Sequence, residues 1–171
     1  MKLPAHPVRT GQARRGFPEM YYTLISCPLT SPTRRDGALA GRLFLLLMIQ
    51  YHLAEDIDLR VKEILRKLKM THVDETRLIC LRSKGSGSRR VIARCHGLSR
   101  IMQLALNKNP HYAIEVLSER FDRLSQEDQT KVLIHEILHI PHSFGGGFRA
   151  HKPFVTRAKV QRMYDEFMKA E

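Results

Sequence analysis

The chain has 171 residues, of which 43% are hydrophobic and 27% are charged, and this composition is ordinary for one soluble globular domain. Its formal net charge of +12 is not ordinary, and it favours anionic partners such as nucleic acid, a membrane surface or an acidic protein. The three cysteines, Cys27, Cys80 and Cys95, are an odd number without metal-finger spacing. They argue against a disulfide framework and favour a reducing compartment, so we expect a cytoplasmic protein.

Residues 1–47 differ in composition from the rest of the chain. They contain most of the eight prolines, and they have seven basic residues against two acidic ones. We predict a leader that is disordered, or that is not translated because synthesis begins at Met48. The apolar run at 43–49 is too short to cross a bilayer and no small-residue cleavage site follows it, so neither a membrane anchor nor export is expected. Residues 48–171, with a net charge of +7, are predicted to form the functional domain.

Apolar patterning predicts a helix, a short sheet and a basic loop before residue 125. Residues 53–70 carry apolar side chains every three or four positions, which is typical of an amphipathic helix. Strands are expected where β-branched and other apolar residues gather, at 76–81, 91–95 and 112–117, and a short helix at 98–106. The loop at 82–90, RSKGSGSRR, lacks the residue order of a phosphate-binding P-loop, which disfavours nucleotide binding, but it is compatible with contacts to DNA or RNA phosphates.

Residues 132–151, VLIHEILHIPHSFGGGFRAH, carry the clearest chemical signature. His135, Glu136 and His139 form an HExxH motif in a helix that Ser125 is expected to cap. Side chains four residues apart leave the same face of a helix, so both imidazoles can reach one metal ion while Glu136 projects beside them toward a metal-bound water. The aliphatic residues around them predict a buried helix, in which a bound dication compensates the interior polar groups. We expect this ion to be Zn²⁺.

A catalytic zinc needs a third protein ligand and an open position for water. His151 is the main candidate, because it follows three glycines whose freedom to adopt positive φ lets the chain fold back over the metal. His142 would share the face of His135 if the helix continued, but Pro141 argues against a regular continuation. Cys95 and a more distant acidic residue are further alternatives at this point.

The motif and the residues after it resemble a known family. The string HEILHIP is similar to part of the signature of small archaeal and phage metallopeptidases and, more distantly, to that of SprT-type zincins. The positions after it that also match the signature are Phe144, Gly146, Gly147, Arg149 and His151. The similarity covers about residues 51–169 and has no counterpart in the leader. It implies metal ligation by His135, His139 and His151 and a catalytic base at Glu136. It assigns no role to His142.

The predicted fold class is α+β. We expect a small zincin-like domain with an N-terminal helix, a short sheet of about three strands, the HExxH active-site helix and a C-terminal helix at 156–168. In zincin-like folds, an edge strand beside the metal helix can hold an extended substrate by adding it to the sheet. Residues 112–117 and 91–95 are the two candidates for this strand.

The expected activity is zinc-dependent hydrolysis of peptide bonds. Zinc lowers the pKa of a bound water toward about 7, and Glu136 can then take the proton and pass it to the leaving amine. Arg149, Tyr112 and His142 are alternative candidates for stabilising the oxyanion. We expect a protein or peptide substrate, including one associated with nucleic acid if the basic surface recruits the enzyme there, as it does for SprT-type proteases.

Two other functions compete with this one. Peptide deformylases also use HExxH, with a cysteine ligand that Cys95 could supply, but the segment here is CHGLS and not the deformylase-like EGCLS. A basic nucleic-acid-binding module with a structural zinc site would need four protein ligands, whereas three are apparent. Zinc content of Cys95 and His151 variants tests the first alternative, and nucleic-acid affinity at modest salt tests the second. Nothing in the sequence indicates an oligomeric state.

Overall fold

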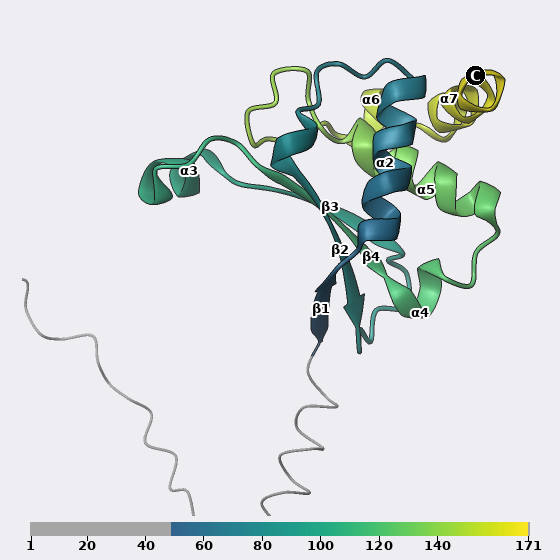
Figure 1. The fold of residues 1–171 in the computed structure, drawn as a ribbon, viewed down its shortest axis with the longest axis horizontal. Coiled ribbons are helices and arrows are strands. Elements are labelled where there is room, and N and C mark those ends of the chain that lie inside the picture. The colour runs from purple at the N-terminus through teal and green to yellow at the C-terminus, as the bar shows by residue number, and fades with distance from the viewer. Residues whose placement is uncertain (1–48, 171) are drawn as a thin grey trace, which may run out of the picture. The chain divides into compact units, whose positions relative to one another are not determined.

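The computed structural model describes residues 49–170, so the predictions for the leader and for a start at Met48 lie outside it. The elements in chain order are β1 (Gln50–Leu53), α2 (Glu55–Lys67), the 3-10 helix η1 (Glu75–Arg77), β2 (Leu78–Lys84), β3 (Ala93–Gly97), α3 (Arg100–Leu106), β4 (Tyr112–Leu117), α4 (Ser118–Phe121), α5 (Gln126–Leu138), α6 (His151–Phe154) and α7 (Arg157–Lys169). In the described chain, the strands form one mixed sheet in the order β1-β2-β4-β3. Figure 1 shows α2, α5 and α7 gathered on one side of the sheet. The predicted α+β class is confirmed.

The sheet has four strands where about three were predicted. β1 pairs antiparallel with β2, with Leu53 opposite Leu81, and all four residues of β1 are exposed. A strand that is exposed on both faces shows no alternation of apolar and polar residues, and sequence reasoning therefore assigned Leu53 to the following helix. In the structure, Leu53 is 74% exposed and α2 begins at Glu55. β2 also continues to Lys84, into residues that were predicted to be loop.

The position of β4 corrects a prediction about substrate binding. β4 pairs in parallel with β2 on one side and antiparallel with β3 on the other. Its backbone groups are used on both sides, so residues 112–117 have no free edge to offer an extended peptide. β3 lies at the edge of the sheet and packs beside α5. Of the two candidate segments, the one that contains β3 is the one with a free edge.

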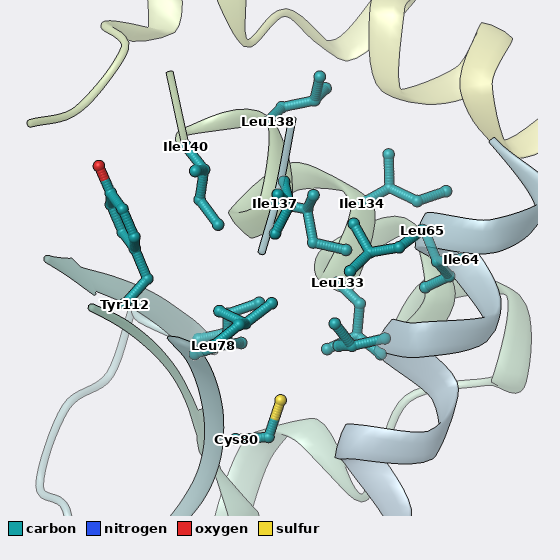
Figure 2. Packing of buried hydrophobic residues seen from close by; sticks show 14 of the residues in the cluster. Ile64, Leu65, Leu78, Cys80, Tyr112, Leu133, Ile134, Ile137, Leu138 and Ile140 are labelled. Carbon is teal, nitrogen blue, oxygen red and sulfur yellow. The ribbon is translucent and has the colours of Figure 1, made fainter. Parts of the chain in front are cut away.

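The core lies between the sheet and the helices α2 and α5, as Figure 2 shows. The side chains that meet there include Leu78, Tyr112, Ile64, Leu65, Leu133 and Ile137. The predicted burial of the metal helix is confirmed, because Leu133, Ile134 and Ile137 of α5 are each 0% exposed. Burial of each such side chain contributes about 1.5–3 kcal/mol, so α5 is held firmly against the sheet. This packing orients the face of α5 that carries the two histidines.

Both ends of α5 follow from local sequence. The Ser125 hydroxyl accepts a hydrogen bond from the backbone N–H of Asp128 at 3.1 Å, which is the predicted N-cap. The helix ends at Leu138, and Pro141, which has no N–H, prevents a further turn. His139 is the C-cap residue and still has right-handed helical angles. It therefore remains one turn above His135 on the same face.

The C-terminal helix is also close to its predicted position. α7 runs from Arg157 to Lys169, and the Thr156 hydroxyl caps it by accepting a hydrogen bond from the backbone N–H of Lys159 at 3.3 Å. α7 packs on α5, where the Lys131 ammonium lies 4.8 Å from the centre of the Tyr164 ring. Among the helices between residues 49 and 170, none combines the length and apolar character needed to cross a membrane.

Candidate metal centre

The fold brings together the three histidines that the sequence singled out. His135 and His139 project from α5, and His151 is the first residue of α6. One ring nitrogen from each lies within 4.8 Å of the other two, and the Nε2 atoms of His135 and His139 are 3.3 Å apart. Two nitrogens bound to a tetrahedral zinc at roughly 2.0–2.1 Å are separated by about 3.3–3.4 Å. The three residues therefore fit a single ion of that size.

The orientation of His139 is set by the chain that follows it. His139 Nδ1 lies 2.8 Å from the carbonyl oxygen of Arg149, so this nitrogen carries the hydrogen and donates it. The other nitrogen, Nε2, then presents its lone pair to His135 and His151. The backbone N–H of Arg149 in turn donates to the His139 carbonyl at 2.8 Å. A second hydrogen-bonding partner of this kind is what holds a metal-binding imidazole in the correct tautomer.

The environment also keeps His135 neutral. Burial, together with the nearby His139 and His151, lowers the pKa of His135 to about 4. Its ring is therefore uncharged at neutral pH, with a lone pair available to a metal ion. The donor set thus fits a metal ion in chemistry as well as in geometry.

Glu136 lies beside the histidines and is itself buried, with 8% of its surface exposed. Burial raises the pKa of its carboxyl group to about 7, and a hydrogen bond with the backbone of Cys95 partly offsets this increase. A nearby cation favours the ionised carboxylate and lowers this pKa further. A carboxyl group that titrates close to neutral pH is well suited to accept and return a proton.

A glycine loop carries the chain from α5 back to His151, and two buried side chains hold it. The Tyr112 hydroxyl accepts a hydrogen bond from the N–H of Gly146 at 2.8 Å and donates one to the carbonyl of Gly147 at 2.8 Å. The side-chain amide of Gln103 donates to the carbonyl of Gly145 at 3.0 Å. Sequence reasoning identified the loop but missed Gln103, and it considered Tyr112 only as an oxyanion donor. Their burial, 3% and 1% exposed, is a property of the folded chain.

Gly146 itself cannot be replaced without moving its surroundings. Its φ is +89°, a conformation that side chains disfavour. An added Cβ would lie 2.1 Å from the carbonyl oxygen of Leu98 and 2.3 Å from the Gln103 amide nitrogen. The glycine therefore allows the loop to pass close to the segment between β3 and α3, and this close approach returns His151 to the site.

The alternative ligands are not part of the histidine cluster. The His142 ring packs against His72, with ring centres 4.3 Å apart. Burial raises the pKa of the Cys95 thiol to about 12, so it stays protonated at neutral pH and is a poor metal ligand. Within residues 49–170, the group of His, Cys, Asp and Glu side chains close enough to share an ion consists of His135, His139 and His151.

A pocket of about 890 Å³ opens beside the cluster. Its lining includes the segment Arg90–Arg94, at and before the start of β3, together with residues of α7 and of the turn before it. His135, Glu136, His139 and His151 also line it. The three candidate oxyanion donors are not among the lining residues, and the Tyr112 hydroxyl is already used by the glycine loop. Arg157 and Gln161 of α7 are polar groups that do line the pocket.

Three converging imidazoles with a buried carboxylate beside them, in an α+β domain, are an arrangement suited to a metal-dependent hydrolase. Residues 49–167 match the protein family described as "Putative phage metallopeptidase", and the chain belongs to this family. The chain is thus a member of a metallopeptidase family, whose chemistry requires a metal ion. No curated protein and no solved structure matches it.

Proposed function

We propose that this protein is a zinc-dependent metallopeptidase that hydrolyses peptide bonds, with Glu136 as general base and His135, His139 and His151 as metal ligands. The observation that carries the proposal is the convergence of three imidazole nitrogens, within 4.8 Å of one another, beside a buried carboxylate. Three protein ligands leave one position of a tetrahedral ion open, as in catalytic zinc sites.

The type of ligand favours zinc. Imidazole nitrogen suits Zn²⁺, whereas Mg²⁺ and Ca²⁺ prefer oxygen ligands. When bound, the ion supplies a Lewis acid that polarises the substrate carbonyl and acidifies a coordinated water. The protein prepares both helix histidines for it, since His135 is held neutral and His139 is held in the tautomer whose Nε2 carries the lone pair.

Glu136 is the group that moves the proton in this proposal. Its carboxylate accepts a proton from the attacking water and delivers it to the nitrogen of the leaving amine. Its burial matters because a carboxyl group with an ordinary pKa would be a weaker base at neutral pH. The backbone of Cys95 is near enough to lower the pKa of the Glu136 carboxyl group, which places Glu136 beside β3, where the substrate backbone is expected.

The free edge of β3 is the proposed site for the substrate backbone. Leu117 N–H bonds to the Ile92 carbonyl, and Leu98 N–H bonds to the His111 carbonyl. In an antiparallel pair the hydrogen-bonded positions alternate, so residues 94 and 96 face β4, while the N–H and C=O groups of Ala93 and Cys95 face away from it. An extended peptide that pairs with Ala93 would place its backbone beside Glu136.

The test is hydrolysis of an unfolded protein by the full-length chain loaded with zinc. Glu136→Gln should retain one zinc per chain and lose at least about 100-fold in kcat/KM, because proton transfer is removed while the ligands remain. Glu55→Gln, an exposed position in the first turn of α2 that does not line the pocket, is the matched control and should keep normal turnover. Undiminished hydrolysis by the Glu136 variant would remove this residue from its role. A zinc-loaded wild-type protein that cleaves nothing would refute the activity itself.

The likeness to SprT-type zincins and to archaeal members of the family stays a prediction, as does a cytoplasmic location. The net charge of +12 supports the further proposal that the substrates are proteins associated with DNA or RNA. Binding to labelled DNA and RNA at low salt tests it, since phosphate contacts are strongest there. The alternative is a nucleic-acid-binding module with a structural zinc site. It would be favoured if the wild-type chain hydrolyses no protein but binds nucleic acid and holds zinc tightly.

A further inference from the structure

The pocket beside the histidine cluster is lined by an excess of positive charge. Four basic and two acidic residues contribute to its walls: Arg90, Arg94, Lys131, Arg157, Asp128 and Glu136. The carboxyl groups of Asp128 and Glu136 each have another structural or chemical role. Asp128 accepts a hydrogen bond from the Ser125 hydroxyl at 2.8 Å at the start of α5, and Glu136 is the buried carboxyl group beside the histidines.

Two of the basic groups are already committed to partners. Arg94 pairs with the carboxylate of Glu115 at 3.2 Å, on the strand next to β3. The Lys131 ammonium pairs with Glu127 and lies over the ring of Tyr164. Neither cation is therefore free to bind a ligand without giving up an existing contact.

Arg90 and Arg157 are different. Both are exposed, and within residues 49–170 neither guanidinium forms an ion pair. Arg90 comes from the segment before β3, and Arg157 is the first residue of α7, so two different segments bring these side chains to the same pocket. A free guanidinium is a strong and directional donor to carboxylates, which it can bind through two parallel hydrogen bonds.

From this arrangement we infer that the pocket selects peptides with acidic side chains near the bond that is cut, with Arg90 and Arg157 binding the carboxylates. The inference rests on the proposed peptidase function and names the class of substrate. Arg90 lies five residues before Cys95, whose backbone meets Glu136. At about 3.3 Å per residue, the Cα atom of Arg90 lies within about 16.5 Å of the Cα atom of Cys95, a distance that about five residues of an extended peptide span, so we expect the acidic residue within about five positions of the cut bond.

The test compares peptides that differ only in charge. Each fluorogenic peptide has the same central bond, flanked on both sides by Glu, by Gln or by Lys. We expect kcat/KM for the Glu peptide to exceed that for the Gln peptide by roughly three- to fivefold for each arginine that is engaged, and the Lys peptide to be the poorest. This preference should shrink at about 1 M salt, where charges are screened beyond about 3 Å.

Variants assign the preference to the two side chains. Arg90→Gln and Arg157→Gln should each reduce the Glu-to-Gln ratio, and the double variant should bring it close to one. Arg66→Gln removes the same charge from an exposed position on α2 that does not line the pocket, so it should leave the ratio unchanged. Equal cleavage of the Glu and Gln peptides by the wild-type chain, or a preference that survives the double substitution, would overturn the inference.

Binding separates this inference from the proposed activity. The Glu136→Gln chain, with zinc loaded, is titrated with fluorescein-labelled forms of the same peptides. One outcome is that the Glu peptide binds more tightly than the Gln peptide in a way that depends on Arg90 and Arg157, while the wild-type chain hydrolyses neither peptide. This result would support the inferred preference for acidic peptides and would refute the proposed peptidase activity. A single-stranded oligonucleotide of equal charge that displaces the Glu peptide at far lower concentration would show a nucleic-acid site instead, and would overturn it.

Discussion

The hydroxyl group of Tyr112 should control metal affinity although it does not touch the metal site. Tyr112→Phe removes one oxygen atom and keeps the ring, which is 1% exposed, in place. Two hydrogen bonds are lost, and the N–H of Gly146, a buried residue, is left without a partner. Gly147 is exposed, so water can satisfy its carbonyl. The cost is therefore dominated by the Gly146 N–H, about 1–3 kcal/mol.

This cost falls on the loop that returns His151 to the cluster. A loss of about 2 kcal/mol in the closed state of the loop weakens zinc binding by up to about 30-fold, because each 1.4 kcal/mol corresponds to a factor of about ten. Competition with a chromophoric chelator measures this affinity directly. Tyr164→Phe, which removes a hydroxyl group from a half-buried tyrosine of α7, is the matched control and should bind zinc normally.

A double-mutant cycle decides whether Tyr112 acts through His151. His151→Ala alone should weaken zinc binding strongly, because one of three ligands is lost. If the only effect of Tyr112 is to position His151, then Tyr112→Phe should have little further effect in the His151→Ala background. Full additivity of the two losses, or unchanged zinc affinity in Tyr112→Phe, would refute this reasoning.

Two further predictions concern the same loop and the back of the sheet. Gly146→Ala should lose zinc and lower the Tm by several °C, because the added Cβ would lie 2.1 Å from the Leu98 carbonyl oxygen. Gly147→Ala is the control and should be nearly neutral, because a Cβ at that position meets nothing within 4 Å. Equal effects of the two substitutions on zinc content and Tm would contradict this account. Burial would raise the pKa of Glu115, but hydrogen bonds with His96 and Arg94 hold it below its usual value. The ionised Glu115 carboxylate therefore stabilises the folded protein at pH values above the pKa that Glu115 has in the unfolded chain. This stabilisation is lost as the pH falls through the lower pKa that Glu115 has in the folded protein. Denaturant unfolding should show Glu115→Gln less stable than wild type by about 1–3 kcal/mol at about pH 7 and similar to it near about pH 3, and a constant difference would sink the assignment.

Local sequence determined the helix that carries the site. The spacing of His135 and His139 places them on one face whatever surrounds them, and Pro141 and Ser125 mark where the helix stops and starts. His151 was predicted from the glycine run before it, and the structure does bring its ring to the other two. The histidine spacing and the two helix ends depend on the helical repeat and on local capping, which neighbouring residues specify.

The tertiary structure decided how the pocket is built around that helix. β1 was missed because its residues are exposed and carry no pattern, and β4 was misjudged as a candidate substrate strand because strand order cannot be read from composition. The anchoring of the glycine loop by Tyr112 and Gln103 joins residues more than 30 positions apart. Arg90 and Arg157 are also far apart in sequence, and they line the same pocket. Such contacts depend on which strands pair and which faces pack, and this choice is made by the free energy of the whole fold and not by any single segment.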